Sequence, residues 1–355
     1  MTCKVLYYFI FINTFFLDKV ILANVVVSSS EVPIVYCLND KNVMQTIVSM
    51  ESAVRNMNED SFYKFILFVP NNFTQDSTRK FTIFQKKYSN KCDVSIMRMS
   101  DEDSKYPPEF YMMFIPYKLE GRFDKVIYID GDTIIRGDLS ELYETGISIN
   151  DFLAGVCDCR VKNNTERVRK IVPQLIEKNN KLGGELAAEC KRYINSGVII
   201  FNVFRINDCK IHLKDKFISI WKTGITLSAC DIVNIICCYD AYKKIIALKY
   251  NMNLKIYGLE DKCVEKFMNR KDIDFFKEEE DEEGERLKAE LKEAIKDPVI
   301  VHFMDEHKPW KSRIGCMREY YNEWLNIFNE IKREYGFEDL KAKRKCCCGH
   351  VGLRA

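Results

Sequence analysis

Short apolar segments alternate with amphipathic ones along the first half of the chain. Residues 32–38, 65–69 and 125–129 are almost wholly apolar, which is typical of strands buried on both faces. Residues 43–57 carry apolar side chains at helical spacing. Because strands joined by helices form covered sheets, we expect an α/β fold with a mostly parallel central sheet flanked by helices. Ligands of such sheets lie beyond the carboxyl ends of the strands.

Further segments extend this pattern through the rest of the chain. The run of like charges within residues 277–285 repels itself and is expected to be a solvated loop. A formal net charge of +2 gives no reason to expect a nucleic acid partner. Helices are expected at residues 78–88, 109–119 and 318–335, and strands at 93–97, 152–157, 197–201 and 299–303.

Two carboxylates, Asp130 and Asp132, follow the strand at residues 125–129, with Gly131 between them. Glycine permits a sharp turn, so both carboxylates can converge on one ion. Oxygen ligands suit Mg²⁺ or Mn²⁺, which commonly carry phosphates. The motif alone leaves three interpretations open: an ordinary turn after a buried strand, a haloacid-dehalogenase phosphatase, or the metal site of a nucleotide-sugar transferase.

A second group of residues lies far downstream. His302 ends the last apolar strand, and Lys308, Pro309 and Trp310 follow in a short loop. Two carboxylates and one imidazole make a mixed oxygen and nitrogen donor set, which favours Mn²⁺ over Mg²⁺. Lys308 can neutralise a diphosphate oxygen. The pattern therefore favours the transferase over the phosphatase.

Four segments in the same order resemble glycosyltransferase family 8, the glycogenin-like and lipopolysaccharide glycosyltransferases. They are residues 32–38, residues 123–143 around the aspartate pair, residues 193–202, and Val301-His302-Phe303 followed by Lys308-Pro309-Trp310. The resemblance covers residues 32–313. It implies a GT-A type nucleotide-diphospho-sugar transferase fold for residues 28–313, followed by a C-terminal helical extension and a basic, cysteine-rich tail at residues 314–355.

The resemblance also implies an activity and its site. The activity is transfer of a hexose from UDP-glucose or UDP-galactose to a hydroxyl of a glycan, lipid-linked glycan or protein, with retention of configuration. Mn²⁺, or alternatively Mg²⁺, would be held by Asp130, Asp132 and His302. Donor-binding residues would be Asn39 and Asp40 near the uracil, Tyr111, Gly131, and Lys308 at the diphosphate, and catalytic residues would be Asn195, Asp158 and Asp231.

Some positions depart from the family pattern. Met113 stands where the family has the arginine of Tyr-x-Arg. Ala229 and Cys230 replace the first two residues of Asp-Gln-Asp. Because these losses remove polar groups that would face the donor, the alternative function is a catalytically impaired member that binds nucleotide sugar or glycan without transfer.

Charge near the diphosphate also changes. Asp305 or Glu306 replaces a glycine between the histidine and the Lys-Pro-Trp segment, which adds negative charge there. Arg136 and Arg313 are the candidates to supply the missing cation.

The N-terminal segment predicts entry into a membrane-bound compartment. Residues 1–27 hold a short apolar run interrupted by two charges, which indicates a signal peptide or signal-anchor, with a buried strand or helix as the alternative. We therefore expect localisation in the secretory pathway (ER/Golgi lumen) or association with a membrane. Asn72 and Asn163 would then be glycosylation acceptors.

The basic tail around Cys346, Cys347 and Cys348 has three open interpretations: lipidation that attaches the chain to a membrane, Cys/His metal binding, or an unstructured end. The chain has 15 cysteines, and no disulfide pairing can be deduced from their spacing.

Overall fold

The computed structural model describes residues 30–158, 161–182, 193–237, 243–253, 282–304, 308–311 and 318–338. The expected signal segment at residues 1–27, the positions Asp305 and Glu306, Arg313, and the cysteine-rich tail lie outside the described residues. Within the described ranges, no helix combines the length and the apolar character needed to cross a membrane.

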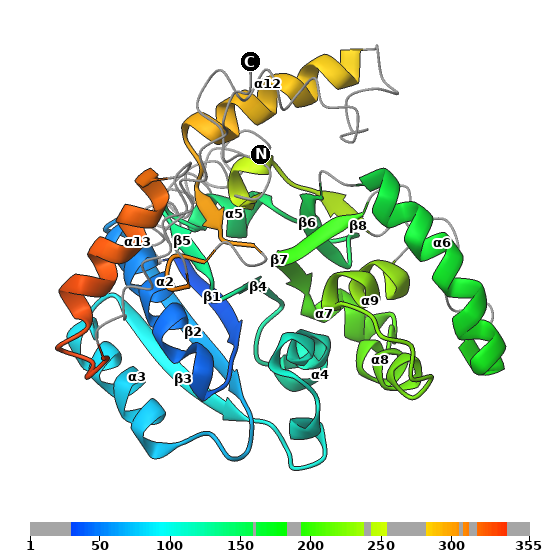
Figure 1. Cartoon of the computed structure of the whole chain (residues 1–355), viewed down its shortest axis with the longest axis horizontal. Helices are drawn as coiled ribbons and strands as arrows, with labels where there is room; N and C mark the ends of the chain where they lie inside the picture. The colour runs from blue at the N-terminus through cyan, green and yellow to red at the C-terminus, as the bar shows by residue number, and fades with distance from the viewer. Residues whose placement is uncertain are drawn as a thin grey trace, which may run out of the picture.

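A seven-stranded sheet forms the centre of the fold (Figure 1). Its order is β3-β2-β1-β4-β7-β6-β8, and all neighbouring pairs are parallel except the two that β7 makes with β4 and β6. The predicted mostly parallel sheet is therefore confirmed. The strands are Ser30–Cys37 (β1), Ser61–Val69 (β2), Cys92–Arg98 (β3), Lys125–Ile129 (β4), Leu153–Cys157 (β6), Ile194–Asn202 (β7) and Lys243–Ile245 (β8).

Two hydrophobic cores cover opposite faces of this sheet, because successive side chains of a strand point to opposite sides. Ile34 and Tyr36 of β1 belong to one core, and Val35 between them belongs to the other. Figure 1 shows α2, α3 and α13 on one side of the sheet and α4, α7, α8 and α9 on the other. The first core includes residues of α2 (Val43–Arg55), α3 (Gln75–Lys87), α5 (Ser140–Thr145), α12 (Glu282–Lys296) and α13 (Arg318–Ile331), and the second includes residues of α4 (Ile115–Leu119), α6 (Val161–Lys178), α7 (Val203–Asp208), α8 (Leu213–Trp221) and α9 (Ala229–Ile236).

Two predicted elements differ in the structure. The helix expected at residues 109–119 is a 3-10 helix, Pro108–Phe114, followed by α4, since Pro116 has no backbone N–H to continue the hydrogen bonding and fits best at a helix start. The prediction of an acidic loop at residues 277–285 is wrong for its last residues, because α12 begins at Glu282. Negative charge is favourable there, since it lies at the positive end of the helix dipole. Residues 277–281 lie outside the described part.

A second, smaller sheet connects distant parts of the chain beside the end of β4. It has the order β5-β10-β9, formed by Thr133–Ile135 (β5), Ile300–His302 (β10) and Met252–Asn253 (β9). Strand β10 is antiparallel to β5, and His302 lies opposite Thr133. This pairing brings a late strand to the residues that follow the aspartate pair.

The C-terminal helix α13 packs on α2 as part of the first core. Trp324 of α13 is fully buried. Glu51 of α2 is also fully buried and accepts hydrogen bonds from Tyr88 (2.6 Å), Tyr335 (2.7 Å) and the Lys87 ammonium (3.1 Å). A buried carboxylate requires such partners, so this contact fixes the end of the described chain to α2.

Candidate active site

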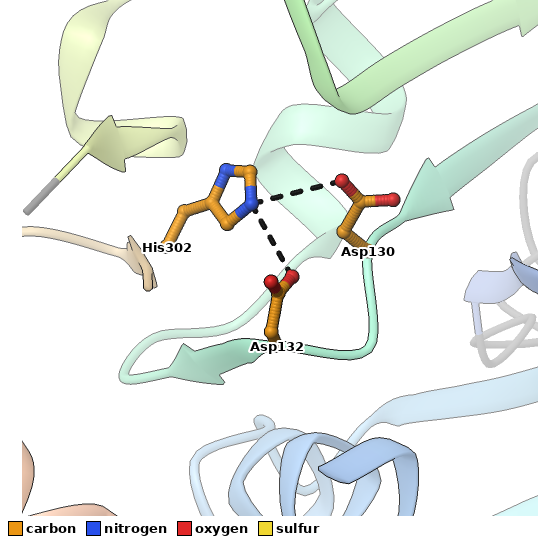
Figure 2. A group of neighbouring side chains, drawn as sticks. All are labelled: Asp130, Asp132 and His302. Carbon is orange, nitrogen blue, oxygen red and sulfur yellow. Dashed lines mark ion pairs between the residues drawn. The ribbon is translucent and has the colours of Figure 1, made fainter. Parts of the chain in front are cut away.

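Asp130, Asp132 and His302 meet where β4 ends (Figure 2). The Nε2 atom of His302 lies 3.6 Å from Asp130 Oδ2 and 3.3 Å from Asp132 Oδ1. One ligand atom from each residue lies within 4.8 Å of the other two. The structure therefore brings together the three residues predicted to hold a metal.

Backbone and side-chain hydrogen bonds hold the two carboxylates in place. The Asp130 N–H donates to the Gly197 carbonyl of β7 (2.8 Å), and the Asp130 carboxylate accepts a hydrogen bond from the buried Tyr128 hydroxyl. The Phe303 N–H donates to the Asp132 carbonyl (2.9 Å), which continues the β5–β10 pairing. Each acid is thus tied to a different strand that crosses the site.

Two glycines permit the close approach of neighbouring groups. From the sequence we expected Gly131 to be needed for a sharp turn. It is not among the described glycines with positive φ, so its backbone conformation does not require glycine. Instead, a Cβ at this position would lie 2.6 Å from Thr46 Oγ1 on α2. A Cβ at Gly197 would overlap the imidazole of His302. Gly197 therefore leaves the space that the His302 ring occupies.

The charges of the site favour a cation between the acids. Burial, together with the nearby Asp132 charge, raises the pKa of Asp130 to about 6. Burial also opposes ionisation of Asp132, but His302 and Lys308 outweigh it and lower the pKa of Asp132. Two adjacent carboxylates and an imidazole nitrogen form a donor set that suits Mn²⁺. The residues present therefore fit a divalent metal ion.

Lys308 lies at the edge of this group. Its ammonium contacts the Asp132 carboxylate and the Phe303 carbonyl. Trp310, two residues on, packs against Trp324 of α13 with ring centroids 5.1 Å apart. With the Gln45 amide oriented so that its oxygen faces the indole, that oxygen accepts from Trp310 Nε1 at 3.2 Å. Helices α2 and α13 thus hold the loop that presents Lys308.

Asn195 and Asp158 adjoin the His302 side of the site. Asn195 Nδ2 lies 3.5 Å from Asp158 Oδ2, and both residues are buried. Asn195 Oδ1 accepts from the Gly197 N–H (2.8 Å) and from Asn251 Nδ2 (3.0 Å). Asn251 Oδ1 in turn lies 3.1 Å from His302 Nδ1. Two predicted catalytic residues are therefore connected to the predicted metal ligand through Asn251.

Asp231 makes a different set of contacts. One carboxylate oxygen accepts from the Ser228 N–H (3.0 Å) and the Ser228 hydroxyl (2.7 Å), which forms a capping box at the start of α9. The other accepts from Tyr193 (2.9 Å) and Arg167. These contacts stabilise α9 and its packing. The neighbouring Cys230 thiol instead contacts the Ser196 hydroxyl of β7 at 2.8 Å.

Residues predicted near the nucleotide are mostly engaged in local structure. The Asn39 side chain accepts from the Lys41 N–H (3.0 Å). Asp40 accepts from the Thr74 hydroxyl (2.6 Å), Thr74 being the N-cap of α3. Tyr111 is 1% exposed, and its hydroxyl lies 3.4 Å from the Ser104 carbonyl.

The candidate replacement for the missing arginine lies elsewhere. Arg136 pairs with Glu323 of α13 (3.2 Å) and lies over the Tyr320 ring, so it joins α13 to β5. Met113 is buried in the second core with 1% exposure. Within the part of the chain that the structure describes, the lysine that contacts the aspartate pair is Lys308.

Sequence reasoning missed Asn251 and Gly197. Asn251 precedes the two-residue strand β9, which is too short to produce a hydrophobic pattern. Gly197 lies inside a strand, where a glycine signals a close approach without identifying its partner.

The fold is of the GT-A type and resembles that of solved glycosyltransferases. The apo WbbM bifunctional glycosyltransferase is 18% identical over 86% of this chain and 51% of its own, with a TM-score of 0.60. The galactosyltransferase LgtC, in complex with donor and acceptor sugar analogues, is 14% identical over 85% of this chain and 99% of its own, with a TM-score of 0.58. GlyE of Streptococcus pneumoniae TIGR4 is 19% identical over 88% of this chain and 66% of its own, with a TM-score of 0.54. This chain thus spans about half the length of WbbM.

The sequence places the chain in a particular family. The model of Glycosyl transferase family 8 matches residues 33–313, and the chain belongs to this family. No curated protein matches the sequence significantly. The predictions of family and fold are therefore confirmed, and the chain is a glycosyltransferase by family.

Proposed function

We propose that the protein is a metal-dependent, retaining hexosyltransferase that uses a UDP-sugar and a hydroxyl acceptor on a glycan, lipid-linked glycan or protein. The observation that carries this proposal is the convergence of Asp130, Asp132 and His302, with ligand atoms within 4.8 Å of one another. Family membership and the likeness to LgtC, which was solved with donor and acceptor sugar analogues, support the sugar-transfer chemistry.

The proposed division of labour follows from the position of each group. When bound, Mn²⁺ would supply electrostatic stabilisation of the departing diphosphate. Lys308 would place a second positive charge beside it, since its ammonium already contacts Asp132. Asn195 and Asp158 would orient the hydroxyl groups of the transferred sugar through their amide and carboxylate.

A decisive test is Mn²⁺-dependent release of UDP from a panel of UDP-sugars, including UDP-glucose and UDP-galactose. Replacing Asp132 by Asn should lower the rate on the order of a hundredfold or more, because one of the two metal-facing carboxylates is lost. Asp215→Asn is the matched control, since the Asp215 side chain is 73% exposed on α8. Full turnover in the Asp132 variant would refute the assignment of the site.

A catalytically impaired binding protein is the second candidate. It is favoured by the burial of Met113 and by the pairing of Arg136 with Glu323, which leave the position of the family arginine without its charge. Calorimetry with UDP and Mn²⁺, followed by the turnover assay, separates the two functions. Metal-dependent UDP binding without hydrolysis or transfer across donor and acceptor panels would favour the binding protein.

We also propose that the chain enters the secretory pathway through residues 1–27, with Asn72 as a glycosylation acceptor. In support, Asn72 is exposed, in the turn that precedes α3. Translation in the presence of microsomes should add an endoglycosidase-sensitive glycan that Asn72→Gln removes. Absence of protease protection and of any glycan would contradict the proposed route.

A further inference from the structure

We propose that Asn251 is a positioning residue that holds a proton on His302 Nδ1, so that Nε2 is the ring nitrogen left to bind a metal beside the two aspartates. The inference concerns how a metal ligand is prepared, and its metal-binding consequence rests on the proposed function. It depends on the direction of every hydrogen bond in one buried chain, from Gly197 through Asn195 and Asn251 to His302.

The direction of the chain is set by a backbone group. The Gly197 N–H can only donate, and it lies 2.8 Å from the Asn195 side chain. The Asn195 atom that it contacts must therefore be the oxygen. The amide nitrogen of Asn195 then points the other way, 3.5 Å from Asp158 Oδ2, and an ionised carboxylate accepts such a donor. Both neighbours of Asn195 require the same amide orientation.

Asn251 inherits its orientation from Asn195. Its side chain lies 3.0 Å from the Asn195 oxygen, so the atom placed there must be the donating Nδ2. Its Oδ1 is consequently the atom that lies 3.1 Å from His302 Nδ1. Asn251 is 2% exposed, and a buried amide with a donor facing a donor would be strongly disfavoured. An inverted Asn251 would be equally disfavoured, because its oxygen would face the Asn195 oxygen and two acceptors would oppose each other.

The tautomer of His302 follows from this geometry. Because Asn251 Oδ1 can only accept, the stable arrangement places a proton on Nδ1. Nε2 is then the ring nitrogen left for a metal, and it lies 3.3 Å from Asp132 and 3.6 Å from Asp130. Histidine ligands commonly donate their other N–H to an oxygen acceptor, which fixes the ring and increases its basicity. Asn251 provides that acceptor here.

Strand β7, which carries Asn195 and Gly197, also fixes the position of the His302 ring. Gly197 lacks the Cβ that would overlap the imidazole, and its N–H begins the hydrogen-bond chain. One glycine therefore provides both the space for the ring and the reference for its tautomer. The same series of hydrogen bonds also joins His302 to Asn195, which we place at the transferred sugar.

The test combines a direct measurement of the tautomer with a measurement of metal affinity. Long-range ¹H–¹⁵N spectra of the metal-free protein report whether Nδ1 of each histidine carries a proton. The chain has four histidines, so the His302→Gln spectrum identifies the His302 signals. The wild type should show a protonated Nδ1 at His302. An unprotonated Nδ1 at His302 in the wild type would overturn the inference.

Substitution of Asn251 should change both measurements. Asn251→Leu should give a mixed or reversed tautomer and weaken Mn²⁺ binding, measured by calorimetry, by about 10- to 100-fold. Asn251→Asp retains an oxygen facing Nδ1 and should keep Nδ1 protonated, although its second oxygen cannot donate to Asn195 as the amide does. Asn207→Leu is the control for loss of a well-bonded amide, because Asn207 of α7 donates to the Pro116 carbonyl (2.8 Å), away from His302.

The outcomes distinguish this inference from the proposed function. If the wild type binds no Mn²⁺ but shows the expected tautomer, the metal site is refuted and the orienting role of Asn251 stands. If the wild type binds Mn²⁺ while Asn251→Leu changes neither the tautomer nor the affinity, the role of Asn251 is refuted and the metal site stands. Should Asn251→Leu fail to fold, Asn251→Ser, a smaller polar replacement, gives the same comparison.

Discussion

At the scale of single residues, the site depends on what is absent as much as on what is present. Asp130, Asp132 and His302 are the candidate metal ligands, while Gly197 leaves room for the ring of His302. A methyl group added at Gly197 would therefore displace the imidazole of His302. This makes a substitution that adds no charge a sharp probe of the site.

Gly197→Ala should weaken Mn²⁺ binding by about tenfold or more, since the new Cβ would displace the His302 ring from the aspartates. Calorimetric titration with MnCl₂ measures the effect, and thermal unfolding shows whether the fold survives. Gly155→Ala on the adjacent β6 is the control, because its Cβ would contact the Ile194 side chain (Cδ1 at 3.0 Å and Cβ at 3.3 Å) and not the imidazole. Equal Mn²⁺ affinity in wild type and Gly197→Ala would contradict the structural role.

Sequence reasoning found the residues of the site whose chemistry is visible in the residue type. Two acids after an apolar strand and a histidine ending another are recognisable patterns, and the structure brings them together. Asn251 was not recognisable, because an asparagine before a two-residue strand has no distinctive neighbours. The contacts of Asp231 were equally hidden, since a capping aspartate and a catalytic one look the same in sequence.

At the scale of elements, strands were predicted better than the connections between them. Strand β4 has the predicted bounds, because five consecutive residues are mostly apolar and buried. The short strands β5 and β9 were not predicted, since three and two residues cannot display a period. These strands form the sheet that places His302. The sequence therefore predicted that His302 meets the two aspartates, but not the strand pairing that brings them together.

The start of α9 provides a test of Asp231. Ser228→Ala should lower the free energy of unfolding by about 1 kcal/mol, since it removes the capping side chain. Asp231→Asn should destabilise the protein at least as much, because Asp231 also accepts from Tyr193 and Arg167. Urea unfolding measures both. A catalytic role for Asp231 beyond this structural one predicts a loss of turnover in Asp231→Asn that Ser228→Ala does not share.

Asp138 connects β2 to the start of α5 and predicts a dependence of stability on pH. Burial opposes its ionisation, but donors that include the Asn58 N–H (2.9 Å) and the Ser61 hydroxyl (2.8 Å) outweigh it and lower the pKa of Asp138. A pKa that is lower in the folded state stabilises the protein above the unfolded value of about 3.9 and loses this effect as the pH falls. The stability difference between wild type and Asp138→Asn should therefore shrink below about pH 4 in urea unfolding. A difference that grows on acidification would contradict this assignment, and Asp215→Asn serves as the exposed control.

At the scale of the whole molecule, the C-terminal helix belongs to the same core as the transferase domain. The predicted boundary at residue 314 separates α13 in sequence, but Trp324 and Tyr335 pack with α2 and α3 in the first core. Trp324 also contacts Trp310, which follows Lys308 in the loop at the site. The helix therefore stabilises the fold and supports the loop that carries a predicted donor-binding residue.

Trp324→Ala should lower the free energy of unfolding by about 3–5 kcal/mol, because a fully buried indole leaves a large cavity. The same substitution should raise the KM for the UDP-sugar, since Trp310 loses the ring against which it packs. Trp221→Ala, at a side chain that is 40% exposed on α8, should cost less stability and leave KM unchanged. A change in stability without any change in KM would show that α13 does not support the Lys308 loop.

The antiparallel pairing of His302 with Thr133 has a consequence for how such a chain tolerates insertions and deletions. Successive residues of a strand face opposite sides, so adding or removing a single amino acid within Ile300–His302 would turn the imidazole away from the acids. Length changes before α12 need not have this effect, because strand pairing rather than chain length sets the location of the ring. Divergence in this protein should therefore accumulate as changes in loop length, while the spacing within one three-residue strand stays fixed.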